Sequence, residues 1–233
     1  MKIGLWNVDH PEKASGSEKK ERRFDDVVDY LVRADCDAYI ITEANAAIRL
    51  PGYFCELSAH SPFKSSRRFY GPPNSYHQVA VYSRSPLRRV ELAEPVNGLR
   101  CRISGAGDLK EVYGNVITIK DQWRKDSSKT YSDRLDEQIQ AIQRLPSCGV
   151  LVAGDFNLRL GWPQRLFAHR RIKAELSACG WVWPTETRGD TVQHVLHSND
   201  LDLQLTIDQS VKYDRSAGTG VSDHPFIQIS VGV

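Results

Sequence analysis

Apolar and polar residues alternate along the chain in segments that favour helices and strands in mixed order. Residues 18–33 carry apolar side chains at the i, i+3, i+4, i+7 spacing of one helical face. Residues 38–42 form a short continuous apolar run, which is typical of a buried strand. Further helices are predicted at 132–145, capped by Ser132, and at 163–179. Further strands are predicted at 3–8, 78–83, 112–119, 149–153, 192–196, 203–207 and 225–231.

The predicted strands outnumber the predicted helices, and helices stand between some of them. This order favours β-sheets packed together with helices on the outside. The sequence has no internal repeat, no low-complexity segment and no long Pro/Gly/Ser linker. We therefore expect residues 1–233 to form a single domain.

Composition narrows the class of protein without identifying a function. The 233 residues are 40% hydrophobic and 26% charged, with a formal net charge of +2, as in an average globular domain. No apolar run approaches the ~18 residues of a membrane span, and the N-terminus is too polar for a signal peptide. The five cysteines are widely spaced without a C-x-x-C pair, which argues against a disulfide framework or a cysteine zinc site. We expect a cytoplasmic protein without a membrane span.

Basic residues are unevenly distributed. Residues 61–90 and 156–174 contain several Lys and Arg and no acidic residue, with aromatic residues interleaved. Two such stretches on one face would attract a polyanion, and aromatic rings would stack on bases. Alternatively, the two basic stretches are ordinary solvated surface without a binding role. Nucleic acid is the predicted partner, and the candidate contacts are Arg67, Arg68, Arg84, Arg159, Arg170 and Arg171.

Polar residues follow or precede several of the apolar runs at the points where strands should end. If these ends converge, they form an oxygen-rich pocket in which the carboxylates repel one another. A hard divalent cation relieves that repulsion, and Mg²⁺ prefers such oxygen ligands together with a substrate phosphate. The residues concerned are Asn7, Glu43, Asp155, Asn157, Asp223 and His224.

The same segments resemble motifs of the endonuclease/exonuclease/phosphatase superfamily, in the family's order. The chain has Leu-Trp-Asn-Val at 5–8, an apolar strand ending in Glu43, and Val-Ala-Val-Tyr-Ser-Arg-Ser-Pro-Leu at 79–87. It also has Gly-Asp-Phe-Asn at 154–157 and Ser-Asp-His-Pro at 222–225. The resemblance implies an α/β (α+β) fold: two packed mixed β-sheets flanked by helices in a four-layer sandwich.

The resemblance also implies a role for each matching residue. Asn7, Glu43 and Asp223 would serve the metal, which is Mg²⁺ with Mn²⁺ as a substitute. Asp155 would orient or deprotonate the attacking water. Asn157 would bind the scissile phosphate, and His224 would stabilise the transition state.

Two positions depart from the family pattern. Lys120 lies where many relatives carry His or Tyr; it would either neutralise transition-state charge or be a surface lysine. Gln193 lies where relatives carry an Asp that pairs with the motif histidine. Gln193 would orient His224 without adding a negative charge, which would weaken catalysis.

The predicted function is that of a divalent-metal-dependent phosphodiesterase, a nuclease that cleaves nucleic acid by attack of an activated water. Two alternatives stay open. One is a phosphomonoesterase, or a phospholipid or inositol phosphodiesterase, on the same scaffold. The other is a nucleic-acid- or partner-binding module whose catalysis is weakened by the substitutions at Gln193 and Lys120.

Overall fold

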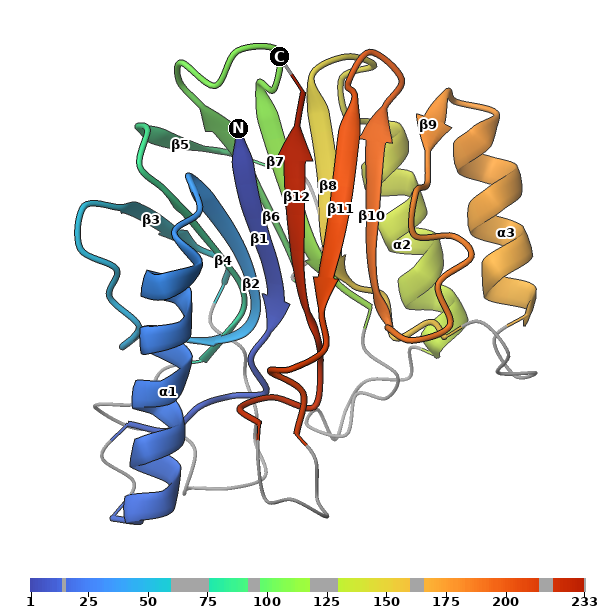
Figure 1. Cartoon of the computed structure of the whole chain (residues 1–233). Coiled ribbons are helices and arrows are strands. Elements are labelled where there is room, and N and C mark those ends of the chain that lie inside the picture. The colour runs from blue at the N-terminus through green and yellow to red at the C-terminus, as the bar shows by residue number, and fades with distance from the viewer. Residues whose placement is uncertain are drawn as a thin grey trace.

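The computed structural model describes residues 1–13, 16–59, 76–91, 97–117, 130–159, 166–213 and 220–232, which form two packed mixed β-sheets with helices outside (Figure 1). The first sheet runs in the order β11 (Leu203–Asp208), β12 (Phe226–Val231), β1 (Lys2–Asn7), β2 (Ala38–Asn45), β4 (Tyr76–Ser83) and β3 (Phe54–Leu57). The second runs β5 (Leu87–Val90), β6 (Gly98–Ile103), β7 (Glu111–Val116), β8 (Val150–Asp155), β10 (Gln193–Ser198) and β9 (Trp181–Val182).

Three apolar layers hold the sandwich together. The inner faces of the sheets meet through residues such as Leu5, Ile40 and Leu151. Helix α1 (Glu18–Ala34) covers the outer face of the first sheet. Helices α2 (Tyr131–Gln143) and α3 (Leu166–Ser177) cover the second sheet (Figure 1). The predicted four-layer arrangement of two mixed sheets between helices is therefore confirmed.

The helix predicted at 132–145 begins one residue earlier and has a different cap. Thr130, not Ser132, is the N-cap, and it forms a capping box with Asp133. The strands β3, β5, β6 and β9 were not predicted from the sequence.

No helix among the described residues is long and apolar enough to cross a membrane.

Parallel pairing brings the polar strand ends to one edge. β1 and β2 are parallel, with Asn7 opposite Thr42, so Asn7 and Glu43 emerge together. β7 and β8 are parallel in the second sheet, and β8 ends at Asp155, opposite the first residue of β10. This shared edge is the lower end of both sheets in Figure 1.

Candidate active site

Asp155 lies between the two sheets and is the most deeply buried carboxylate of the site. Its Oδ2 accepts a hydrogen bond from Asn7 Nδ2 at 2.8 Å, and its Oδ1 accepts one from the backbone N–H of Asn157 at 2.8 Å. Burial raises the pKa of Asp155 to about 6; the nearby Glu43 adds to this effect and His224 opposes it. A carboxylate with a pKa near the operating pH is suited to general-base chemistry.

Glu43 faces His10, which lies on the segment that follows β1. His10 Nδ1 lies 2.9 Å from Glu43 Oε2. Burial acts to raise the Glu43 pKa, but the His10 imidazole, helped by His224 and Asn7, outweighs it and lowers the pKa to about 2. Burial likewise acts to lower the His10 pKa, but Glu43 raises it overall. Glu43 is therefore an ionised carboxylate at the mouth of the site.

The segment before β12 brings Asp223 and His224 to the same edge. The backbone N–H of His224 donates to Ser222 Oγ at 3.1 Å, and Ser222 Oγ donates to the Asn7 carbonyl at 2.6 Å. His224 Nε2 lies 3.2 Å from Asp223 Oδ1. Both residues line a pocket of about 230 Å³ that also includes Asn157, Arg159 and Lys212.

Gln193 does not orient His224 by the predicted contact. Its Oε1 accepts from the backbone N–H of Asn7 at 2.5 Å, and its Nε2 donates to the Pro225 carbonyl at 2.6 Å. The side chain points to these main-chain groups because β10 pairs with β8 and places Gln193 beside the end of β1. Gln193 thus ties the strand ends together, and its carboxamide makes no hydrogen bond to the His224 ring in the described structure.

Backbone strain is concentrated at this edge. Asp9, His10, Glu43 and Asn157 are four of the five non-glycine residues with positive φ in the described chain, with values of 48°, 49°, 54° and 48°. Such conformations are costly for residues with a side chain, and they persist where the surroundings enforce them, commonly at functional sites.

The predicted basic residues do not all lie at the site. Arg159 lines the pocket. Arg84 lies at the opposite end of the first sheet, where it pairs with Asp35 and stacks on the Tyr53 ring. Arg170 and Arg171 both lie on α3, where Arg170 is exposed and Arg171 pairs with Asp136 of α2. Lys120, Arg67 and Arg68 lie outside the described residues.

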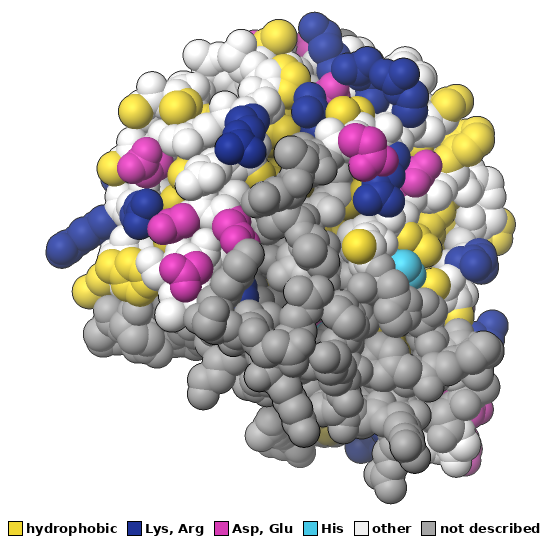
Figure 2. Space-filling view, turned by 180° about the vertical axis from the view of Figure 1, so that it is seen from behind, with side chains coloured by type: hydrophobic (Ala, Val, Ile, Leu, Met, Phe, Trp, Pro, Cys, Tyr) yellow, Lys and Arg dark blue, Asp and Glu magenta, His cyan; other side chains and the backbone are white. Residues whose placement is uncertain are grey.

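The back face of the molecule carries both signs of charge. Figure 2 shows Lys and Arg side chains gathered toward the upper end of this face, with Asp and Glu side chains among them. In the part of the chain that is described, this face therefore has no continuous basic track. Among the predicted basic residues that the structure describes, Arg159 alone lines the pocket at the site.

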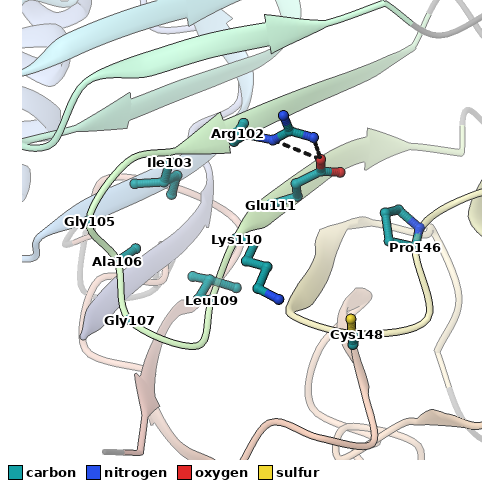
Figure 3. Close-up of a pocket in the computed structure, with 10 residues that line it drawn as sticks. All are labelled: Arg102, Ile103, Gly105, Ala106, Gly107, Leu109, Lys110, Glu111, Pro146 and Cys148. Atoms are coloured by element: carbon teal, nitrogen blue, oxygen red, sulfur yellow. Dashed lines mark hydrogen bonds and ion pairs between the residues drawn. The ribbon is translucent and has the colours of Figure 1, made fainter.

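A second pocket, of about 340 Å³, lies at the other end of the second sheet (Figure 3). It is lined by the turn between β6 and β7 and by the loop before β8. Its buried carboxylate, Glu111, is paired with Arg102. Because that charge is already neutralised, this pocket is a weaker candidate for chemistry.

Sequence reasoning missed three residues near the site. Asp9 and His10 follow the end of β1, and Lys212 reaches the pocket from the segment after β11. The signal that identified Asn7, a polar residue at the end of an apolar run, also applied to Asp9 and His10. Their approach to Glu43 depends on the positive-φ turn, which the sequence pattern does not reveal.

The residues present are compatible with a divalent cation. Asp9, His10 and Glu43 offer ligand atoms that all lie within 4.8 Å of one another. The hydroxyl of Thr42, which is level with Asn7 in the sheet, is buried without a hydrogen-bond partner. Two neighbouring carboxylates and an imidazole are donors that suit a hydrated divalent cation.

The chain belongs to the endonuclease/exonuclease/phosphatase family, whose model matches residues 4–224. This family comprises hydrolases. A search of curated proteins found no significant match.

Solved structures share the fold at low sequence identity. A 3'-5' exonuclease from Neisseria meningitidis is 15% identical with a TM-score of 0.64. A mannosyl-6-phosphatase from Bacteroides thetaiotaomicron is 13% identical with a TM-score of 0.64, and an AP endonuclease from Archaeoglobus fulgidus is 14% identical with a TM-score of 0.61. Each comparison covers 100% of both chains. At these identities the structures establish the fold and leave the substrate open.

Proposed function

We propose that the protein is a divalent-metal-dependent phosphodiesterase that hydrolyses nucleic acid. The observation that carries the proposal is the state of Asp155: buried, held by Asn7 and Asn157, and with a pKa raised to about 6 beside Glu43 and His224. Such a group accepts a proton from water near neutral pH.

The site residues divide the chemistry among themselves. Glu43, with Asn7 and Asp223, would hold Mg²⁺ or Mn²⁺. When bound, the cation supplies charge stabilisation at the phosphate oxygens and the leaving group. Asp155 orients the attacking water and takes its proton. Asn157 binds the scissile phosphate, and His224 donates a hydrogen bond to the negative charge that develops on it.

Two basic side chains favour a phosphate-rich substrate. Arg159 and Lys212 line the same pocket as His224, and phosphates on either side of the scissile bond would bind to them. Proteins with this fold include a 3'-5' exonuclease and an AP endonuclease, which is consistent with a nucleic acid substrate. Lys120, Arg67 and Arg68 remain predicted contributors.

A phosphomonoesterase is the second candidate. The pocket beside His224 is small, at about 230 Å³, which suits a compact phosphate ester. Arg84 and Arg171 are paired elsewhere and do not extend the site into a groove. A protein with this fold is a sugar phosphatase. A binding module with weakened catalysis stays a third candidate, because Gln193 stands where the family pattern has an Asp and its carboxamide contacts the Asn7 and Pro225 main chain rather than the His224 ring.

The test is a substrate panel assayed with Mg²⁺ and with Mn²⁺. The panel contains single-stranded DNA, duplex DNA, abasic duplex DNA, RNA and a sugar phosphate, each incubated with the wild type and with Asp155→Asn. We expect metal-dependent cleavage of a nucleic acid by the wild type alone. Cleavage of the sugar phosphate alone would favour the monoesterase. Salt-dependent binding without any cleavage would favour the binding module.

A further inference from the structure

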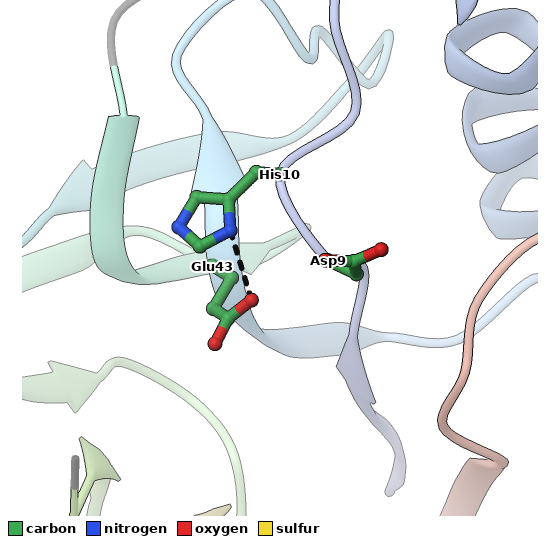
Figure 4. A group of neighbouring side chains, drawn as sticks. All are labelled: Asp9, His10 and Glu43. Atoms are coloured by element: carbon green, nitrogen blue, oxygen red, sulfur yellow. Dashed lines mark ion pairs between the residues drawn. The ribbon is translucent and has the colours of Figure 1, made fainter. Parts of the chain in front are cut away.

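The segment after β1 places a histidine against the carboxylate that is proposed to hold the metal. Figure 4 shows the His10 imidazole facing Glu43, with Asp9 beside the pair. His10 Nδ1 lies 2.9 Å from Glu43 Oε2, and the ligand atoms of all three residues lie within 4.8 Å of one another.

This spacing matches two ligands of a single ion. Ligand atoms that bind one cation at about 2.0–2.2 Å and at right angles stand about 3 Å apart. The separation of 2.9 Å between the imidazole nitrogen and the carboxylate oxygen fits such an edge. Without a cation it is also the length of the hydrogen bond that joins the two groups, so a bound ion would replace the Nδ1 proton and release it to water. Asp9 lies within 4.8 Å of both, and its carboxylate would have to leave its pair with Arg23 to complete the face.

The three side chains are held by their surroundings. The backbone N–H of His10 donates to the Glu43 carbonyl at 3.1 Å, and the His10 ring packs edge-on against Tyr76. Arg23 donates to the carbonyls of Val8 and Asp9 and pairs with the Asp9 carboxylate. The arrangement is therefore pre-organised by contacts from α1, β2 and β4.

An imidazole changes which cation the site prefers. Carboxylates and water suit Mg²⁺, whereas imidazole nitrogen suits transition metals, whose affinity for nitrogen ligands rises along the Irving–Williams order. A ligand set of two carboxylates and one imidazole therefore strengthens the binding of a transition-metal cation and adds little for Mg²⁺.

We propose that His10 is a nitrogen ligand of the metal centre, together with Glu43 and Asp9, so that the centre takes a divalent transition-metal ion in preference to Mg²⁺. This inference rests on the proposed function, because it concerns the same metal centre. It goes further by assigning His10 and Asp9 and by naming the class of cation.

The direct test uses Mn²⁺ as a paramagnetic probe of the complete protein. With one equivalent of Mn²⁺, we expect electron spin echo spectra of the wild type to show modulation from a coordinated imidazole nitrogen. His10→Gln should abolish that modulation. His169→Gln is the matched control, because His169 of α3 also lies beside a carboxylate, with its Nε2 3.3 Å from Glu186 Oε1, and this variant should leave the modulation intact.

Equilibrium titrations supply the second readout. His10→Gln should weaken Mn²⁺ and Zn²⁺ binding by at least about 10–100-fold, because that is the range for losing a partner that only supports a ligand, and a direct ligand contributes no less. Mg²⁺ binding should stay the same or tighten, because Glu43 is then released from its partner. Equal losses for all three cations would overturn the assignment.

The outcomes separate this inference from the proposed function. Mn²⁺ binding without nitrogen modulation in the wild type would overturn the role of His10 and leave the metal-dependent enzyme standing. Modulation that survives in His10→Gln and disappears in His224→Gln would assign the imidazole to His224 instead. Failure of the wild type to bind any divalent cation would overturn both proposals.

Discussion

Two buried carboxylates on neighbouring strands have different hydrogen-bond partners: charged guanidinium groups in one case and uncharged amides in the other. Glu111 begins β7 and accepts hydrogen bonds from Arg100 at 2.6 Å and from Arg102 at 2.7 Å. Asp155 ends the adjacent parallel strand β8 and is held by uncharged amide donors from Asn7 and Asn157. Glu111 is 2% exposed and Asp155 is 1% exposed, so burial does not distinguish them.

The difference lies in what neutralises each charge. The protein supplies two guanidinium groups to Glu111, which completes an ion-pair network within the second sheet. At Asp155, burial and Glu43 together raise the pKa to about 6, although His224 opposes them. A carboxylate with this environment is poised to exchange a proton or to respond to a cation. Glu111 is structural, and Asp155 is the functional candidate.

The largest expected effect is on activity. Asp155→Asn removes the proposed base and should lower the rate of phosphodiester cleavage by about 10²–10⁴-fold. Glu111→Gln, assayed per folded molecule, should retain the wild-type rate within a small factor. The cleavage rates of both variants are measured on the best substrate of the panel. Equal losses of rate in Asp155→Asn and Glu111→Gln would contradict the different roles assigned to the two carboxylates.

For the free energy of unfolding, we expect the large loss at Glu111. Glu111→Gln leaves two arginines facing an uncharged group and should lower the free energy of unfolding by about 3–5 kcal/mol. The control is Glu18→Gln, which breaks an exposed pair with Arg22 and should cost less than about 0.5 kcal/mol. Urea unfolding measures both; a similar small cost for the two variants would contradict the structural role of Glu111.

Asp155→Asn should change the pH dependence of the stability of the metal-free protein. The folded-state pKa of about 6 lies above the ordinary value of 3.8, so the folded protein binds more protons between these values, and stability falls as pH rises through that window. This cost is absent from the variant, which should therefore gain about 3 kcal/mol relative to the wild type between about pH 4 and about pH 7.5. Below about pH 4 the variant should be the less stable protein, because both Asp155 oxygens accept N–H hydrogen bonds and an amide group can accept only one of them. Urea unfolding in a chelator at several pH values tests this, and a gain that did not depend on pH would refute it.

A smaller effect is expected at Gln193, the residue that ties β10 to the end of β1. In Gln193→Asp the new side chain is too short to reach both the Asn7 N–H and the Pro225 carbonyl. It also adds a negative charge directly opposite Asp155 in the sheet. It should lower the free energy of unfolding by about 1–3 kcal/mol without raising turnover. A higher turnover with a shifted pH–rate profile would instead restore Gln193 to a role behind His224.

Much of the site was predictable because its residues lie at the ends of apolar runs. Asn7, Glu43 and Asp155 each stand where a buried strand ends, and parallel pairing brings such ends together. The order of predicted strands and helices also indicated packed sheets with helices outside, whereas the two mixed sheets and the four layers were predicted from the family resemblance.

The parts that escaped prediction depend on contacts between distant segments. The strands β5 and β6 carry Arg88, Arg100 and Arg102, which resemble a charged surface until their pairing with β7 brings two of them onto Glu111. Gln193 could be aligned with a family position, but only the register of β10 shows which groups it contacts. The fold of the turn that carries His10 to Glu43 has no signature in local periodicity.

If the acidic side chains at this edge gather around a divalent cation, binding of the cation should stabilise the folded protein. The most direct measurement is the melting temperature at about pH 7.5, with saturating Mg²⁺ and with a chelator, for the wild type and for Glu43→Gln. We expect the cation to raise the melting temperature of the wild type and to leave that of Glu43→Gln nearly unchanged. An equal rise in both proteins, or none in the wild type, would contradict it.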